Sequence, residues 1–222
     1  MTSKKKIVLL DLDDTLLYTI QTGYKRVNYS LSRLNKRPLS KKEFYKVYGK
    51  IPFPECVKEW VELSQIDQFL YFYEESKKYH KYTTIVSINS LISELKQLNI
   101  DAAMVTNTPA YKMKRKLEEV NIEENLFKHI YCEAQKPSGL GITKTLEKLD
   151  ILPDEAFYIG DSLVDYLAAR DAGVDFMAVL TGNTSQIEFL NVGIDRRSIL
   201  KDIKYLPGVI KEMIKEEGLV YE

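Results

Sequence analysis

Three carboxylates stand close together near the start of the chain, in the segment Asp11-Leu-Asp13-Asp14-Thr15-Leu16. Carboxylates this close to one another resist joint ionisation unless a cation lies between them. A hard divalent cation with oxygen ligands meets that need, and Mg²⁺ is the usual one where phosphate is bound. The segment therefore indicates a divalent-cation site, and an acidic turn that caps a following helix is the alternative.

A second segment whose residues could bind a ligand begins with Thr106 and Asn107. They are followed by Thr108-Pro109, a capping residue and a proline that are typical of the first positions of a helix. A hydroxyl group and free backbone N–H groups at a helix N-terminus can bind phosphate oxygens. Thr108 acting only as a helix cap is the alternative, and it explains most of the pattern.

Lys136 and two aspartates complete the candidates. The ammonium group of Lys136, just before Pro137, could offset the charge of a phosphate, although lysines are common in loops. Asp161 and Asp165 lie four residues apart at the start of a predicted helix, so that both can face one site. Simple interaction with the helix dipole is the alternative for this pair.

Short apolar runs precede these segments and predict the strands that position them. The runs do not alternate with polar residues, which is typical of strands buried on both faces of a parallel sheet. They comprise residues 7–10, 102–106, 129–132, 156–159 and 176–180. Helices are predicted between them at residues 88–98, from Thr108, at 142–149 and at 163–171. This alternation predicts a doubly wound, Rossmann-like α/β core with parallel strands, in which ligands bind beyond the carboxyl ends of the strands.

The region between the first predicted strand, residues 7–10, and about residue 85 contains no further predicted strand and has a helical pattern. Its first helix places apolar residues on one face, namely Ile20, Tyr24, Val27, Leu31 and Leu34. Later helices are predicted from the capping box Ser40-Lys-Lys-Glu43 to Gly49, from Pro54, and from Asp67 to about His80. We therefore predict an α/β core of residues 1–16 and 86–222 with an inserted all-helical cap of residues 17–85.

Composition excludes several classes of partner. Of the 222 residues, 45% are hydrophobic and 29% charged, and 32 basic residues balance 32 acidic ones. With no net field, neither nucleic acid nor a membrane is expected as partner, and the lysine-rich segments 77–81 and 112–116 are interpreted as solvated helix faces. No segment approaches the ~20 apolar residues that span a bilayer, which predicts a cytoplasmic protein. Cys56 and Cys132 are expected to be buried free thiols, with one disulfide as the alternative.

The order of acidic motif, threonine, lysine and paired aspartates resembles the haloacid dehalogenase-like (HAD) hydrolase superfamily. The likeness covers essentially the whole chain, with the helical insertion where capped members carry theirs. It implies a phosphatase of the phosphoglycolate phosphatase-like branch, which hydrolyses a small phosphomonoester with Mg²⁺ through an aspartyl-phosphate. Asp14 stands where many relatives have glycine, and Tyr18 where many have aspartate. The second departure leaves the subfamily and the substrate open.

The resemblance implies a catalytic role for several residues. Asp11 would be the nucleophile. Asp13 would protonate the leaving oxygen and then deprotonate the water that hydrolyses the intermediate. Thr106 and the backbone N–H of Asn107 would bind phosphoryl oxygens, and Lys136 would neutralise charge on the nucleophile and the phosphate.

The resemblance also implies a metal site. Mg²⁺ would be bound by the carboxylates of Asp11 and Asp161 and by the backbone carbonyl of Asp13. Asp165 would orient these metal ligands without binding the ion directly, or it would act through a water molecule.

The predicted cap would exclude water and read the leaving group of the substrate. Its candidate readers are Lys25, Arg26, Tyr45, Tyr48 and Lys50, with plain surface residues as the alternative for each. The expected partner is a small phosphorylated metabolite, and the expected assembly is a monomer or homodimer.

Two other functions are weighed against a phosphatase. A phosphomutase of the same superfamily would keep the phosphoryl group on the enzyme. A phosphorelay receiver also uses acidic residues, a threonine and a lysine, but it needs only ~120 residues and neither Asp161 nor Asp165. Asp13 and Asp161 together also favour release of phosphate over release of halide, since a halide needs no proton to leave.

Overall fold

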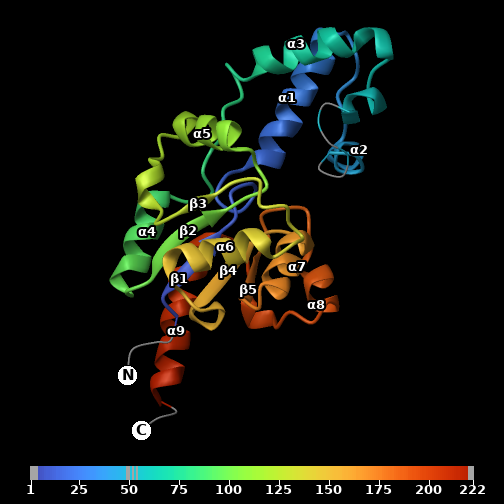
Figure 1. Ribbon diagram of the computed structural model, residues 1–222. Helices are drawn as coiled ribbons and strands as arrows, with labels where there is room; N and C mark the ends of the chain where they lie inside the picture. The colour runs from blue at the N-terminus through green and yellow to red at the C-terminus, as the bar shows by residue number, and fades with distance from the viewer. Residues whose placement is uncertain (1–4, 49–50, 52, 54, 220–222) are drawn as a thin grey trace. The chain divides into compact units, whose positions relative to one another are not determined.

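Within the described residues of the computed structural model, which are 5–48, 51, 53 and 55–219, one sheet is formed by six parallel strands. The strands lie in the order β3-β2-β1-β4-β5-β6, and Figure 1 shows the central ones side by side. Their bounds are Ile7–Leu10 (β1), Asp101–Val105 (β2), Ile130–Tyr131 (β3), Ala156–Gly160 (β4), Asp175–Val179 (β5) and Ile199–Leu200 (β6). The first five coincide with the predicted strands to within about a residue at most ends.

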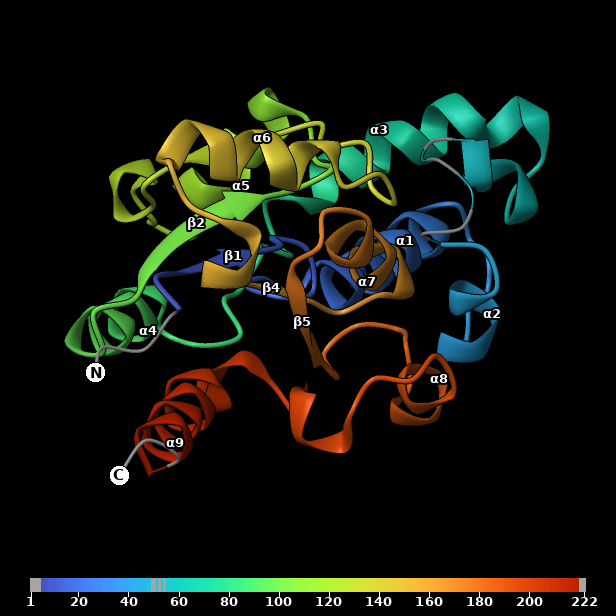
Figure 2. The ribbon, with the colours of Figure 1, turned by 60° about the horizontal axis from the view of Figure 1, so that its bottom comes forward.

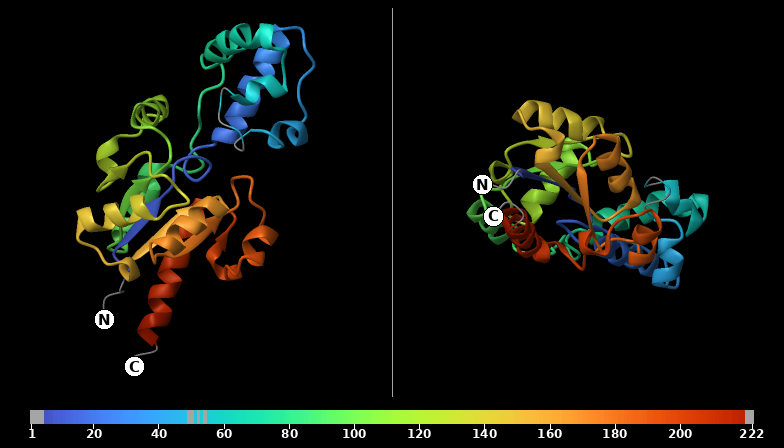
Figure 3. Two further views of the ribbon diagram at one scale, coloured as in Figure 1. Left: turned by 45° about the vertical axis from the view of Figure 1, so that its right-hand side comes forward. Right: turned by 90° about the horizontal axis from the view of Figure 1, so that it is seen from below.

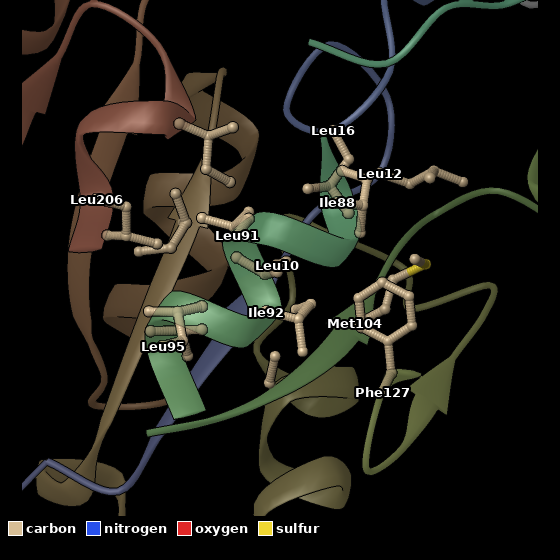
Figure 4. Packing of buried hydrophobic residues seen from close by; sticks show 14 of the residues in the cluster. Leu10, Leu12, Leu16, Ile88, Leu91, Ile92, Leu95, Met104, Phe127 and Leu206 are labelled. Atoms are coloured by element: carbon tan, nitrogen blue, oxygen red, sulfur yellow. The ribbon is translucent and has the colours of Figure 1, made fainter. Parts of the chain in front are cut away.

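Strand β1 lies at the centre of the sheet, and all four of its residues are buried. Successive side chains of a strand point to opposite faces. Leu10 accordingly packs in the core on one face of the sheet, together with Met104, while Leu9 packs on the other. Figure 4 shows Leu10 and Met104 in the same buried cluster as Ile92, which is carried by a helix on this face of the sheet. Burial on both faces explains the uninterrupted apolar runs of the sequence.

Helices cover both faces of the sheet. Figures 2 and 3 show the sheet between α6 on one side and α9 on the other. The helices of this part are α4 (Ile88–Gln97), α5 (Ala110–Glu119), α6 (Leu140–Leu149), α7 (Leu163–Asp171), α8 (Gln186–Asn191) and α9 (Leu206–Leu219). Residues of α4, α5 and α9 pack in the core on one face, and residues of α6 and α7 in the core on the other. This arrangement confirms the predicted doubly wound, Rossmann-like α/β fold.

The chain divides into two compact units, Met1–Leu17 with Thr84–Glu222, and Tyr18–Thr83. The second unit is helical, with α1 (Thr19–Arg33), α2 (Lys41–Tyr45) and α3 (Ile66–Ser76). Val27, Leu31 and Phe44 lie in its separate core, and the Ser40–Glu43 capping box forms as predicted. The helix predicted to run to about His80 ends at Ser76. The predicted helix end at Gly49, the helix start at Pro54, and Lys50 lie outside the described residues.

Short 3₁₀ helices connect these elements at Glu55–Glu59, Leu63–Gln65, Glu124–Leu126, Pro153–Glu155, Arg196–Ser198 and Ile203–Tyr205. Both cysteines are free, Cys56 buried and Cys132 only partly so, which corrects the expectation of two buried thiols. Among the described residues, no helix combines the length and the apolar character needed to cross a membrane.

Candidate active site

The candidate residues gather at the carboxyl edge of the sheet. Because the strand order is β3-β2-β1-β4, the chain leaves β1 toward one side of the sheet and later returns to β4 on its other side. The place where the order reverses is where open α/β sheets bind ligands. Asp11 directly follows β1, Thr106 follows β2, and Asp161 follows β4. Three neighbouring strands thus deliver one polar residue each to the same edge.

Lys136 forms the centre of this cluster. Its Nζ lies 2.7 Å from Asp11 Oδ1, 2.5 Å from Asp165 Oδ1 and 3.0 Å from the Tyr158 hydroxyl. Only 5% of the Lys136 side chain is exposed, and the two carboxylates are as deeply buried. Charge-assisted hydrogen bonds in such a site are short and strong, and they fix the ammonium group against the Asp11 carboxylate.

Asp165 is held by the start of α7. It is the third residue of that helix, and its Oδ2 accepts hydrogen bonds from Ser162 N at 3.1 Å and Ser162 Oγ at 2.5 Å in a capping box. Gly160 permits this, because a Cβ there would lie 2.5 Å from the Asp165 side chain. Asp161 precedes the capping residue and lies outside the helix, whereas Asp165 lies in its first turn. The two aspartates nevertheless face one site, as the sequence predicted. They converge because a strand end and a capping box place them together.

Asp11, Asp161 and Asp165 form a group that suits a metal ion. Each offers a carboxylate oxygen, and these oxygens lie within 4.8 Å of one another. In the part of the chain that the structure describes, no hydrogen bond or ion pair reaches the Asp161 carboxylate. Gly182 lies against it, since a Cβ at this glycine would come within 1.6 Å of Asp161 Oδ2. The Asp13 carboxylate does not belong to this group, which leaves only its backbone carbonyl as the predicted ligand.

The electrostatics of the group are unbalanced. Burial raises the pKa of Asp11 to about 7, against the lowering effect of Lys136 and with further raising by Asp165 and Asp13. Burial likewise raises the pKa of Asp161 well above its usual range, and Asp165 and Asp11 raise it further. Three buried carboxylates thus face one ammonium group. An oxygen-rich, over-acidic set of this kind fits a hard divalent cation, which would favour the charged form of Asp11.

Asp13 makes contacts that the sequence did not predict. Its Oδ2 accepts a hydrogen bond from Thr108 Oγ1 at 2.5 Å, and its Oδ1 accepts one from Lys116 Nζ at 2.5 Å. Helix α5 begins at Ala110 with Pro109 as its N-cap, so Thr108 is not the helix cap that was considered. Lys116 is not part of a solvated helix face either, because its ammonium group turns to Asp13.

Thr106 and Asn107 follow β2, and Asn107 contacts Lys136. The Thr106 side chain is buried, and its Oγ1 accepts a hydrogen bond from Thr108 N at 3.1 Å. The Asn107 side chain binds the backbone of Lys136 in both directions, with Nδ2 donating to Lys136 O at 3.1 Å and Oδ1 accepting from Lys136 N at 2.8 Å. Asn107 therefore anchors the lysine loop through its side chain, where only its backbone was considered.

Tyr158 is a further residue of the site that sequence reasoning missed. It lies in β4, is fully buried, and donates a hydrogen bond from its hydroxyl to Val105 O at 2.9 Å. The same hydroxyl accepts from Lys136 Nζ. A buried tyrosine in an otherwise apolar strand needs a partner for its hydroxyl group, and this was the available signal.

Asp14 adopts a backbone conformation that explains the glycine found here in many proteins of similar motif. Its φ is 56°, in the left-handed region that glycine enters without cost and that aspartate tolerates better than most residues. The Thr181 hydroxyl donates to the Asp14 carbonyl at 2.5 Å. The departure is therefore compatible with the turn that follows β1.

Two of the predicted leaving-group readers have structural contacts inside the helical unit. Arg26 is 1% exposed, donates from Nε to His80 O at 2.8 Å, and lies over the Tyr82 ring at 4.3 Å. Tyr48 stacks on Phe44 with ring centroids 4.3 Å apart. The alternative of Arg26 as a plain surface residue is wrong, because the residue is buried and its guanidinium is used to hold this unit together. Of the other candidates, Lys25 is exposed and Tyr45 partly exposed.

Comparison with known proteins gives independent evidence on the family of this chain. The model of the family described as haloacid dehalogenase-like hydrolase matches residues 8–179. A candidate pyrophosphatase PpaX of Caldanaerobacter subterraneus subsp. tengcongensis is 28% identical over 177 residues, which are 78% of this chain and 80% of that protein. A phosphoglycolate phosphatase of Photobacterium profundum is 26% identical over 185 residues, 75% and 80% of the two chains.

Solved structures show the same fold. A candidate β-phosphoglucomutase from Thermotoga maritima matches with a TM-score of 0.74 and 22% identity, covering 93% of this chain and 99% of that one. At this identity the likeness concerns the fold alone.

Proposed function

The chain belongs to the haloacid dehalogenase-like hydrolase family and is a phosphohydrolase, and on this premise we propose that it hydrolyses a small phosphomonoester with Mg²⁺ through a phosphoryl group on Asp11. The observation that carries the proposal is the contact of Asp11 with Lys136 inside the buried carboxylate group. A carboxylate at the carboxyl edge of the sheet, beside a fixed ammonium group, is suited to attack a phosphorus atom whose charge the lysine offsets.

The metal site is part of the proposal. The carboxylates of Asp11 and Asp161 and the Asp13 carbonyl would hold Mg²⁺. When bound, the ion neutralises charge on the phosphate and keeps Asp11 ionised. Asp165 accepts hydrogen bonds from Lys136 and Ser162 at both of its oxygens, which favours a supporting role behind the direct ligands.

The positions of the side chains support the following reaction. An oxygen of Asp11 forms a bond to phosphorus while the bond from phosphorus to the ester oxygen breaks, and Asp13 gives the leaving oxygen its proton. Asp13 then takes a proton from water, whose oxygen attacks phosphorus and releases inorganic phosphate and the free Asp11 carboxylate. One ester and one water thus yield one alcohol and one phosphate. Lys136, Thr106 and Asn107 would hold the phosphoryl oxygens during both steps.

The helical unit, Tyr18–Thr83, has the role of a cap in this proposal. In this proposal the described residues of the site in the α/β core bind the phosphoryl group and the metal. Other residues therefore have to recognise the rest of the substrate. The two curated relatives carry names with different substrates, pyrophosphate and phosphoglycolate. The identity of the leaving group therefore stays open, within the class of small phosphorylated metabolites.

The test is a screen of phosphorylated metabolites with Mg²⁺ and with EDTA, followed by acid quenching of the best reaction. We expect activity only with Mg²⁺ and a phosphorylated peptide that contains Asp11, detected by mass spectrometry. Equal amounts of alcohol and inorganic phosphate would distinguish a phosphatase from a phosphomutase, which retains the phosphoryl group. Full activity after exhaustive chelation, or phosphate release without any phosphopeptide in rapid-quench samples, would contradict the proposal.

A further inference from the structure

One cation of α5 differs from its neighbours. The helix carries Lys112, Lys114, Arg115 and Lys116, of which the first three are exposed. The side chain of Lys116 is only 14% exposed and makes an ion pair with Asp13 across 103 positions of the chain. A surface lysine would gain little from an exposed pair. The partial burial of Lys116 therefore indicates a more specific role.

The packing of α5 explains why this lysine reaches the site. Met113 and Leu117 are the buried residues of the helix and belong to the core on that face of the sheet. Lys116 is three positions after Met113 and next to Leu117, so it borders the buried stripe. Its place is set by the core, and the ammonium group is delivered to the loop after β1.

Three contacts join the side chains of Asp13, Thr108 and Lys116 to one another. Lys116 Nζ lies 2.5 Å from Asp13 Oδ1, Thr108 Oγ1 lies 2.5 Å from Asp13 Oδ2, and Lys116 Nζ lies 3.3 Å from Thr108 Oγ1. Each oxygen of the carboxylate therefore has a different donor. Two donors of different kinds fix the rotation of a carboxylate more firmly than one can.

We propose that Lys116 and Thr108 are positioning residues that hold the Asp13 carboxylate for proton transfer to the leaving oxygen. An ammonium group only donates hydrogen bonds, so Oδ1 stays an acceptor beside Lys116. A hydroxyl group both donates and accepts, so Thr108 can remain bonded to Oδ2 whether or not that oxygen carries a proton. Oδ2 is then the oxygen that gives the proton. The inference rests on the proposed function, because it assumes that Asp13 acts on the leaving group.

The test compares two esters that differ in their need for a proton. An alkoxide leaves slowly without protonation, whereas 2,4-dinitrophenolate leaves readily without it. We expect Lys116→Met to lower kcat/KM for the best alkyl phosphate about tenfold or more, and kcat/KM for 2,4-dinitrophenyl phosphate by about twofold at most, a fraction of the usual general-acid effect. Thr108→Val is expected to act in the same direction and Thr108→Ser to retain activity.

Matched variants separate positioning from structure. Lys114→Met removes a cation from the exposed face of the same helix and should change neither ester. Lys116→Arg keeps the cation and should recover part of the loss. In a double-mutant cycle, Lys116→Met should cost little more once Asp13→Asn is present, because both remove the same function. Thermal unfolding identifies any variant that fails to fold, and Thr108→Val then carries the test.

The outcomes distinguish this inference from the proposed function. If Asp13→Asn lowers kcat/KM of the alkyl ester selectively but Lys116→Met and Thr108→Val lower both esters equally, the inference is wrong and the proposed function stands. Additive losses in the double-mutant cycle would lead to the same conclusion. If Asp13→Asn itself affects both esters equally, the role of Asp13 fails, and the inference fails with it.

Discussion

At the residue scale, Asp11 combines a catalytic position with an unfavourable environment. It is buried beside Asp165 and near Asp13, with Lys136 as its counter-charge. Keeping a buried group ionised in such company lowers the stability of the fold unless a cation is present. Reactivity and stability are therefore expected to respond in opposite directions to changes at this position.

Asp11→Asn is expected to abolish turnover without lowering the unfolding temperature in EDTA at pH 8. The pKa of Asp11 rises from 3.8 to about 7 in the fold, so its contribution to stability is fully present below pH 3.8 and is lost as pH rises through 7. At pH 8 the carboxylate is ionised at a cost that the neutral amide avoids. Thermal unfolding and kinetics check this. A variant that keeps a tenth of wild-type kcat, or that melts several degrees lower, would contradict it.

Gly182 is a second residue whose substitution should affect the site, because it lies against the Asp161 carboxylate. Gly182→Ala places a Cβ within 1.6 Å of Asp161 Oδ2, so the carboxylate has to move. We expect the Mg²⁺ concentration for half-maximal activity to rise about tenfold or more, as for other changes that displace a metal ligand. Gly208→Ala is the control, because within the described structure a Cβ at that position would meet no heavy atom within 4 Å outside its chain neighbours and its own helix backbone. An unchanged Mg²⁺ requirement in Gly182→Ala would exclude Asp161 as a ligand.

At the scale of elements, the first turn of α7 serves both the helix and the site. Ser162 caps the helix and also donates two hydrogen bonds to Asp165, which in turn accepts from Lys136. Helix α8 has a capping box of the same type, formed by Ser185 and Glu188. The two boxes provide a matched pair, because in the described structure only the first is bonded to the lysine of the site.

Ser162→Ala and Ser185→Ala are both expected to lower the free energy of unfolding by about 1 kcal/mol, the usual value of an N-cap. Only Ser162→Ala should also lower kcat, since Asp165 loses the contacts that orient it behind Lys136. Chemical denaturation and steady-state kinetics of the two variants check this. Equal kcat values in both would show that the α7 capping box stabilises the helix and nothing else.

At the scale of the whole molecule, folding, protonation and metal binding are linked. Burial raises the pKa of both Asp11 and Asp161, and for Asp11 it raises the pKa to about 7, so below pH 7 the folded protein holds a proton on Asp11 that Mg²⁺ has to displace. A ligand that binds only the native state stabilises it by RT ln(1 + [L]/Kd), so the stabilisation grows as the ligand binds more tightly. The stabilising effect of Mg²⁺ on the fold therefore depends on pH.

We expect Mg²⁺ to raise the unfolding temperature more at pH 8 than at pH 5. At pH 5 Asp11 is protonated in the fold, because 5 lies below its pKa of about 7, whereas at pH 8 the metal meets an ionised carboxylate. Asp161→Asn removes one carboxylate of the group and should abolish most of the difference. A Mg²⁺ effect that is equal at both pH values, or larger at pH 5, would show that the ion binds elsewhere.

Several features of this protein were determined by local sequence. The apolar runs predicted the parallel strands, and polar residues directly after them could be placed at one edge of the sheet, which brought Asp11, Lys136, Asp161 and Asp165 together in the prediction. These features can be predicted because a few consecutive residues are enough to indicate a strand that is buried on both faces. The same residues also indicate where that strand ends. The two-residue strand β6 and helices α8 and α9 were not predicted. A run of two residues, as in β6, is too short to show the periodic spacing of apolar residues that indicates a strand.

Only the tertiary structure decided which partners the side chains have. Lys116 meets Asp13 across 103 positions, the Tyr158 hydroxyl reaches Val105 across 53, and Gly182 lies against Asp161. In sequence, Lys116 belongs to a run of cations with the pattern of a solvated helix face, and Tyr158 is one apolar residue among others. Their functions arise from how α5 and β4 pack in the sheet. Packing depends on contacts between distant segments, and residue type and spacing along the chain do not encode these pairs directly.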